Sequence, residues 1–312
     1  MADGSPIFYT LDANPLEGSR ADPGAEGRTA GCARSAPPAL LLDGIGCDGF
    51  VWKYLAPALT GQRSVLHMCY RGHGRTPRPR DLSRITIADL ADDAASVLAD
   101  AEAGAAVLIG HSMGVQVALE TTRRHRDRVA ALILVCGAPG EVLRTFRGTG
   151  AFAAALPRAR AAVERAPRLW SRALRSLLPT RAAFAIAAQL EIRADLLERD
   201  DFMPYLEGMA RVDADLFLAM LEGANSHSAR PFLATIDVPV LIVAGDRDGF
   251  TPPGLSREMA AEIPGAELFM VAGGSHTAPI ERPKEVTAAI VSFISRLGIA
   301  ELPEKIEFPK KI

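Results

Sequence analysis

One serine of the sequence stands where a nucleophile could be presented to a substrate. Ser112 lies in the segment GHSMG, between the apolar run Ala106 to Ile109 and a helical pattern that follows it. A sharp turn from a strand into a helix strains its central residue and leaves no room for side chains two positions away, which explains Gly110 and Gly114. Because so short a motif also arises by chance, the flanking strand and helix carry the prediction.

A serine hydroxyl is a poor nucleophile until a neighbouring base removes its proton, so a histidine and an orienting carboxylate are expected elsewhere. Of the six histidines, His276 follows the last predicted strand, where a loop could bring it over Ser112. The others stand in a predicted buried strand, in a turn, beside Ser112 but directed away from it, at an Arg-rich helix end and in a helical segment: His67, His73, His111, His125 and His227. The sequence therefore predicts His276 as the base.

The segment VLIVAGDRDGFTPP supplies the carboxylate, because it places Asp246 and Asp248 directly after another predicted strand. We expect Asp248 to accept a hydrogen bond from the Nδ1–H of His276, which would fix the tautomer and stabilise the imidazolium. Asp246 is expected to turn the loop. Glu141, which follows a different predicted strand, is the alternative acid.

A tetrahedral intermediate at Ser112 would need backbone donors for its negatively charged oxygen. One is expected to be the N–H of Met113, and the other comes from the loop LLDGIGCDGF, most simply from Ile45. Gly44 and Gly46 would let this backbone approach closely. The alternative is a glycine-rich turn without a ligand.

Short apolar runs alternate with helical patterns along the chain, as a parallel sheet covered on both faces requires. The expected strands are Ile7 to Leu11, Ala39 to Leu42, Val65 to Cys69, Ala106 to Ile109, Ala131 to Cys136, Val240 to Ala244 and Leu268 to Val271. Covering helices are expected after a capping box at Thr86 and between Pro283 and Gly298. The predicted fold class is α/β, with a mostly parallel, twisted sheet flanked by helices.

The strand pattern disappears between residues 141 and 236, which indicates an inserted all-helical unit. We expect an N-terminal strand and flexible loop over 1–38, an α/β core over 39–140 and 237–298, the helical unit over 141–236, and a C-terminal tail over 299–312. Arg144 to Arg193 holds ten arginines and two acidic residues, whereas Ala194 to Glu222 holds eight acidic residues and two arginines. The basic half could favour an anionic substrate or be a solvated face.

The overall composition excludes several classes of protein. The 312 residues carry 35 Lys and Arg against 37 Asp and Glu, a net charge of −2, and 48% are hydrophobic, which argues against a disordered chain and against a nucleic-acid partner. The longest apolar runs are about eight residues and no signal-peptide pattern precedes them, so we expect no membrane span and a cytoplasmic location. The spacing of Cys32, Cys47, Cys69 and Cys136 fits neither a zinc site nor a disulfide framework. We expect no metal and no cofactor.

Taken in order, these motifs resemble the α/β-hydrolase fold superfamily, specifically capped serine hydrolases that include esterases, lactonases, carbon–carbon bond hydrolases and cofactor-free haloperoxidases. The matching pieces are DGIG, YRGHGRT, GHSMG, GDRDGFTP and GGSHTAPIERP, which lie within Leu40 to Gly140 and Val238 to Leu297. The resemblance implies a nucleophile elbow at Ser112, the acid Asp248, the base His276, an oxyanion hole from Ile45 and Met113, and a cap domain formed by the helical unit.

Two positions depart from the family pattern. Asp43 stands where the family usually has a histidine before Gly44, which puts a carboxylate into the oxyanion loop, and Cys69 stands where an aspartate is common. A serine rather than an aspartate at position 112 argues against the family's epoxide hydrolases and haloalkane dehalogenases.

The sequence therefore predicts a serine hydrolase that cleaves a small-molecule ester, lactone or thioester through an acyl-enzyme. Carbon–carbon bond hydrolysis, perhydrolysis or acyl transfer with the same triad is the alternative within catalysis. A ligand receptor without catalysis on the same fold is the alternative outside it.

Overall fold

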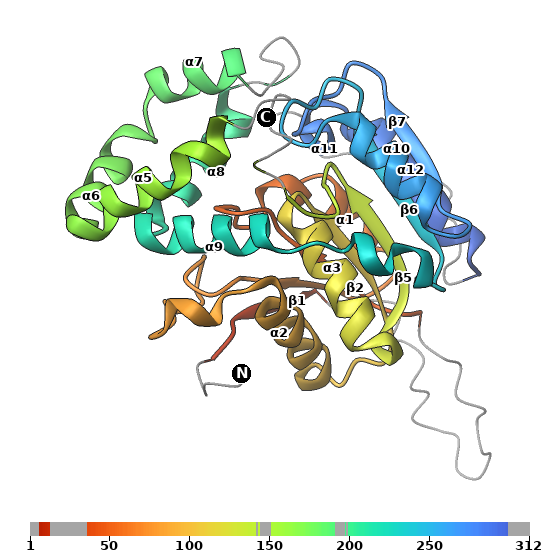
Figure 1. Ribbon diagram of the computed structural model, residues 1–312. Coiled ribbons are helices and arrows are strands. Elements are labelled where there is room, and N and C mark those ends of the chain that lie inside the picture. Colours follow the sequence, from red (N-terminus) through yellow and green to blue (C-terminus); the bar gives the residue numbers. More distant parts are fainter. Residues whose placement is uncertain are drawn as a thin grey trace, which may run out of the picture.

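A seven-stranded sheet forms the centre of the protein, for which a computed structural model describes residues 6–12, 36–141, 143, 151–190, 197 and 199–298 (Figure 1). The strand order is β1-β3-β2-β4-β5-β6-β7. β1 pairs antiparallel with β3, and all the other neighbouring strands pair parallel. The strands are β1 (Tyr9–Asp12), β2 (Ala39–Leu42), β3 (Val65–Met68), β4 (Ala106–His111), β5 (Val129–Val135), β6 (Val240–Gly245) and β7 (Glu267–Val271). The mostly parallel sheet predicted from the sequence is confirmed.

Helices cover both faces of this sheet, which is why its central strands are apolar without alternation. In β2, Leu40 and Leu42 pack into one buried cluster with side chains of α2 and α3, while Ala39 and Leu41 pack into another with side chains of α1 and α12. The helices of the core are α1 (Leu55–Thr60), α2 (Ile87–Asp100), α3 (Met113–Arg124), α10 (Pro253–Glu262), α11 (Ala278–Glu281) and α12 (Pro283–Arg296).

The two predicted covering helices begin and end at the expected signals. The Thr86 hydroxyl accepts a hydrogen bond from the Asp89 N–H, and the Asp89 carboxylate accepts one from the Thr86 N–H, so a capping box starts α2. At the other end of the chain, Pro283 occupies the first turn of α12, and Gly298 follows the helix with φ +66°.

The chain between β5 and β6 contains α5 (Ala151–Arg165), α6 (Pro167–Leu177), α7 (Arg181–Leu190), α8 (Arg199–Arg211) and α9 (Ala214–Ser226). Figure 1 shows α5 to α8 grouped at one side of the sheet core, with α9 leading back toward it. We call these five helices the helical insertion. Aromatic side chains join it to the core: the ring of Phe50, in the short helix η2 (Phe50–Trp52), stacks on Tyr205 at 4.9 Å and meets the edge of Phe202 at 6.1 Å.

Some sequence predictions lie partly outside the described residues. The loop expected after β1 is described only from residue 36, and the tail 299–312 is not described. In the described ranges, no helix is long and apolar enough to cross a membrane. Cys47, Cys69 and Cys136 are buried free thiols, and Cys32 lies outside the described residues.

Candidate active site

Ser112 sits in a strained turn between β4 and α3. Its backbone angles are φ 55° and ψ −117°, a region that residues other than glycine rarely adopt. A Cβ added to Gly110 would lie 2.2 Å from the carbonyl oxygen of Gly114, and one added to Gly114 would lie 2.1 Å from the carbonyl oxygen of Leu42. Backbone occupies both places, so the two glycines are required for the turn, as the sequence suggested.

The structure brings Ser112, His276 and Asp248 into one hydrogen-bonded chain. The Ser112 hydroxyl lies 2.9 Å from Nε2 of His276, and Nδ1 of the same ring lies 2.9 Å from Oδ2 of Asp248. The ring nitrogen that faces the carboxylate must carry the proton, which leaves Nε2 free to accept one from the serine. This arrangement is the one that a serine nucleophile with a histidine base requires.

Asp248 is fixed by its own loop as well as by His276. Its Oδ1 accepts hydrogen bonds from the N–H groups of Phe250 and Thr251, and its Oδ2 accepts one from the Thr251 hydroxyl, all at 2.8 to 2.9 Å. The neighbouring Asp246 instead accepts a hydrogen bond from the Gly273 N–H and links the loop after β6 to the loop after β7. The two aspartates therefore take the different positions that the sequence suggested.

A second carboxylate, which the sequence patterns did not indicate, holds the loop that carries His276. Glu281 in α11 accepts hydrogen bonds from the Ser275 N–H at 2.7 Å, the Ser275 hydroxyl at 2.5 Å and the Thr277 hydroxyl at 3.0 Å. These two residues flank His276 on either side. The spacing of Ser275, Thr277 and Glu281 within one short segment was the available signal.

His111 lies against His276 rather than away from the site. Its Nε2–H donates to the backbone carbonyl of His276 at 2.9 Å, and the two ring centroids are 5.0 Å apart. Burial, followed by the proximity of His276, lowers the pKa of His111 to about 4. Within the described part of the chain, its Nδ1 has no hydrogen-bond partner. His111 is therefore neutral at pH 7 and holds the His276 segment through the backbone carbonyl of that residue.

The loop after β2 runs close beside the serine. A Cβ added to Gly44 would lie 3.1 Å from the Cβ of Ser112, so the backbone of the next residue, Ile45, also comes near it. The Gly46 N–H is already used, because it donates to Nε2 of His73 at 3.0 Å. Met113 is the first residue of α3, where an N–H has no acceptor within the helix. Ile45 and Met113 thus lie in the two segments beside Ser112, the loop after β2 and the first turn of α3.

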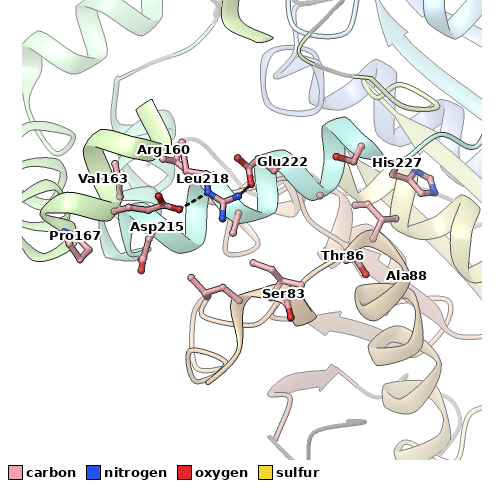
Figure 2. Close-up of a pocket in the computed structure, with 17 residues that line it drawn as sticks. Ser83, Thr86, Ala88, Arg160, Val163, Pro167, Asp215, Leu218, Glu222 and His227 are labelled. Atoms are coloured by element: carbon pink, nitrogen blue, oxygen red, sulfur yellow. Dashed lines mark hydrogen bonds and ion pairs between the residues drawn. The ribbon is translucent and has the colours of Figure 1, made fainter. Parts of the chain in front are cut away.

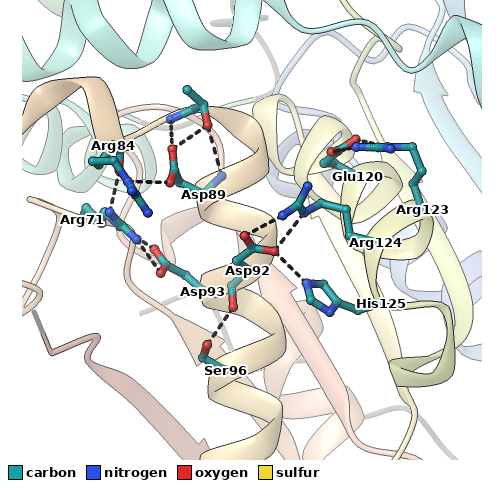
Figure 3. A network of polar contacts seen from close by, with 11 residues as sticks. Arg71, Arg84, Asp89, Asp92, Asp93, Ser96, Glu120, Arg123, Arg124 and His125 are labelled. Carbon is teal, nitrogen blue, oxygen red and sulfur yellow. Dashed lines mark hydrogen bonds and ion pairs between the residues drawn. The ribbon is translucent and has the colours of Figure 1, made fainter. Parts of the chain in front are cut away.

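His73 is held in turn by the segment YRGHGRT. Its Nδ1–H donates to the Arg71 carbonyl at 3.2 Å, and the buried Arg71 guanidinium forms two hydrogen bonds with Asp93 of α2, at 2.6 and 2.7 Å (Figure 3). A planar guanidinium matches a carboxylate in this paired geometry. The arginine of the motif therefore anchors the turn to α2, and the histidine anchors the loop beside Ser112.

Asp43 is turned into the protein and fully paired. Its carboxylate accepts hydrogen bonds from the Gly49 N–H at 2.9 Å, the Trp52 indole N–H at 2.7 Å and Nε2 of His67 at 2.7 Å. Burial would raise the pKa of the Asp43 carboxyl, but His67 and the other two donors together hold it below its usual value. Asp43, which departs from the family pattern, thus closes the loop after β2 on itself and ties it to β3. The other departure, Cys69, places its Sγ 3.5 Å from Asp48.

Helix α8 of the insertion reaches this loop. A Cβ on Gly46 would lie 3.2 Å from the Met209 side chain, and a Cβ on Gly208 would lie 3.5 Å from the Gly46 carbonyl oxygen. On the other side of the site, the Phe250 ring lies 4.8 Å from the His276 ring, and its side chain is partly exposed. Phe184, Phe202 and Tyr205 of the insertion pack together in a cluster with Phe50.

A separate cavity lies away from this site. It has a volume of about 710 Å³ and is lined by α5 and α9 of the insertion and by the residues before and at the start of α2 (Figure 2). None of the five predicted site residues lines it. Its charged side chains are paired, since Arg160 contacts Glu164 and Glu222, and Asp215 contacts Arg78.

A serine on a strand-to-helix turn, linked through a histidine to a carboxylate at the carboxyl edge of a mostly parallel sheet, defines the class of α/β-fold hydrolases. The sequence profile of the alpha/beta hydrolase fold matches residues 37–283, and the chain belongs to this family.

Individual relatives agree with this assignment. A protein of Caulobacter vibrioides named "Putative carbamate hydrolase RutD" is 28% identical over 267 residues, which cover 82% of this chain and 89% of that protein. The pimeloyl-[acyl-carrier protein] methyl ester esterase of Neisseria meningitidis is 28% identical over 258 residues, which cover 80% of this chain and 90% of that esterase. The enol-lactonase structure from Burkholderia xenovorans LB400 shares the fold, with a TM-score of 0.72 and 23% identity. The match covers 94% of this chain and 98% of the enol-lactonase chain. The protein is therefore an enzyme, a hydrolase of the α/β fold.

Proposed function

We propose that the protein hydrolyses a small carboxylic ester, lactone or thioester, with Ser112 as nucleophile, His276 as general base and acid, and Asp248 as the orienting carboxylate. The observation that carries this proposal is the pair of 2.9 Å hydrogen bonds that joins the three side chains at the strained turn. Two relatives are named for a methyl ester and a carbamate, and hydrolysis of either takes place at a carbonyl carbon.

The reaction proceeds in two stages. In the first, Oγ of Ser112 attacks the carbonyl carbon while Nε2 of His276 takes its proton, and His276 then gives that proton to the departing alcohol or thiol as the intermediate collapses. This leaves an acyl group on Ser112. In the second stage, His276 takes a proton from water, the hydroxide oxygen attacks the acyl carbon, and the proton returns to Ser112 as the acid leaves.

The N–H groups of Ile45 and Met113 stabilise the negative oxygen of both tetrahedral intermediates. Asp43 and His73 hold the loop in position for this role, because their hydrogen bonds fix it on both sides of Ile45. The unit over residues 141–236, to which the helical insertion belongs, acts as a cap. Met209 of α8 contacts the oxyanion loop, so movement of α8 would change access to Ser112.

Labelling with a fluorophosphonate and hydrolysis of short p-nitrophenyl esters test the proposal together. The wild-type protein should be labelled once and should hydrolyse the ester, whereas Ser112→Ala should do neither. Ser226→Ala, which removes a serine of α9 that lines the separate cavity, is the matched control and should behave as wild type. Undiminished labelling of Ser112→Ala would overturn the assigned nucleophile. Product analysis with an added alcohol would distinguish hydrolysis from acyl transfer.

A further inference from the structure

Helix α6 exposes apolar side chains to an unusual degree. Leu169, Trp170 and Leu177 are 67%, 43% and 63% exposed, and they account for three of the five large hydrophobic side chains that are exposed in the described residues. With 3.6 residues per turn, Leu169 and Leu177 lie in one row with Ala173, and Trp170 lies beside that row. We call Leu169, Trp170 and Leu177 the apolar row.

Arginines form a second row on the same helix. Arg168, Arg172 and Arg175 succeed one another at intervals of four and three residues, so they lie along one side of α6. Together with Arg78, Ser171 and two aspartates, they line a pocket of about 510 Å³. Asp213 and Asp215 pair with Arg78 and Arg175.

The pocket therefore carries more positive than negative charge, with four arginines against two aspartates. Arg168 and Arg172 are exposed, and the described part of the chain offers them no acidic partner. The sequence from Arg165 to Leu190 contains five arginines and no aspartate or glutamate. Both charge and geometry suit an anion at this pocket.

We propose that α6 is a docking surface for an anionic lipid bilayer. The apolar row enters the boundary between headgroups and acyl chains, and Arg168 and Arg172 bind the phosphate or carboxylate groups of the lipid headgroups. A helix with an apolar row that contains tryptophan and leucine, together with an arginine-rich polar side, is the type that lies in the plane of a membrane surface. The proposal does not depend on the reaction assigned to Ser112.

Other occupants satisfy only part of this surface. Free phosphate could pair with Arg168 and Arg172, but it would leave Leu169, Trp170 and Leu177 in water. A second copy in a two-fold dimer could cover the apolar row, but it would also bring another unpaired set of arginines to the same interface. An anionic bilayer supplies an apolar phase and negative charge together.

Tryptophan fluorescence and vesicle sedimentation test the proposal on the full-length protein. The chain has two tryptophans, and Trp52 is buried with its indole N–H bonded to Asp43, so a change on binding would report on Trp170. Vesicles of phosphatidylglycerol and phosphatidylcholine should shift the emission to shorter wavelength and carry the protein into the pellet. Vesicles of phosphatidylcholine alone should do neither, and binding to the anionic vesicles should weaken as salt is added.

Two variants should lose binding for different reasons. Arg168→Gln/Arg172→Gln should bind about fivefold more weakly for each arginine removed, because each charge near an anionic surface contributes about that factor. Leu169→Gln/Leu177→Gln should lose the blue shift of Trp170. Arg257→Gln/Lys284→Gln, which removes two exposed charges from α10 and α12 at the other side of the molecule, is the charge control and should bind like wild type (Figure 1).

Three results would overturn the proposal. One is the absence of binding to anionic vesicles at low salt, and another is binding that is unchanged in both α6 variants. The third is evidence for another occupant in a protein that does not bind vesicles. That evidence would be a response to inorganic phosphate, or a dimer in sedimentation equilibrium that Leu169→Gln/Leu177→Gln dissociates.

Discussion

The loops at the carboxyl edge of the sheet and the helical insertion are built in opposite ways. In the loops, polar side chains are buried and each makes several short hydrogen bonds, as Asp248 and Glu281 do around His276. In the insertion, charged side chains such as Arg160 pair at the surface, and apolar side chains such as Leu169 face solvent. The comparison indicates that geometry is fixed where bonds are to be broken, whereas the insertion presents surfaces for contact.

The largest effect is expected where the fixed geometry is disturbed at its centre. Asp248→Asn should lower kcat for a p-nitrophenyl ester by about 10⁴-fold, because the amide no longer holds the required tautomer of His276. Asp246→Asn changes the exposed aspartate of the same loop and should alter kcat by less than about threefold. Equal losses in the two variants would mean that the loop as a whole, rather than Asp248, matters.

A smaller effect is expected where the two regions meet. Phe202 of α8 is 3% exposed and packs among Phe50, Phe184 and Tyr205. Phe202→Ala should lower the free energy of unfolding by about 3–5 kcal/mol in urea denaturation, because it leaves a cavity between the insertion and the core. Phe202→Leu should lower the free energy of unfolding by a smaller amount, because leucine fills part of that cavity. A change below about 1 kcal/mol for the alanine variant would show that the insertion is held to the core elsewhere.

Lowering the pH should destabilise the folded protein through His111, which is buried against His276. In the unfolded chain His111 binds a proton as the pH falls through about 6.5, whereas in the folded protein it resists protonation until about pH 4. The unfolded state therefore binds more protons between these values, and stability falls as the pH falls. His111 alone should lower the free energy of unfolding by about 3 kcal/mol as the pH falls from 6.5 to 4.

The variant His111→Gln should lose less stability over that range, since the buried group that resists a proton is gone. Urea denaturation of wild type and variant at pH 7.5 and pH 4 gives the difference directly. Identical pH dependence in the two proteins would contradict the assignment.

The smallest effect is expected in the insertion. Arg160 contacts Glu164 and Glu222, but its side chain is 52% exposed. Arg160→Gln should therefore change the free energy of unfolding by no more than about 1 kcal/mol, and 0.5 M salt should reduce that difference further. A larger loss in urea denaturation would show that the insertion, too, depends on fixed ion pairs.

The difference between the sheet core and the helical insertion also explains which features could be predicted from the sequence. Runs such as Ala39–Leu42 and Val240–Gly245 are apolar because both faces of the sheet are covered, so local sequence was sufficient to predict these strands. Ser112, His276 and Asp248 each follow a strand, and parallel strands bring their carboxyl ends to one edge.

Other contacts had no local signal. The bond between Asp43 and His67, and that between Gly46 and His73, join residues 24 and 27 positions apart, and each depends on a side chain whose direction the strand pattern leaves open. In the insertion, helical periodicity indicates which side of a helix is apolar but not which neighbour covers it, and so the exposure of Leu169 and Leu177 could not be predicted.

The glycines on either side of Ser112 set a limit on how this enzyme could be diversified. Because backbone atoms fill the space beside Gly110 and Gly114, a library that randomises either position should yield inactive or unfolded clones almost without exception. A mutational scan would score these positions as intolerant as it scores Ser112, although neither glycine takes part in chemistry. Urea denaturation would separate the two kinds of residue, because Ser112→Ala should fold like wild type whereas substitutions at Gly110 and Gly114 should destabilise the turn.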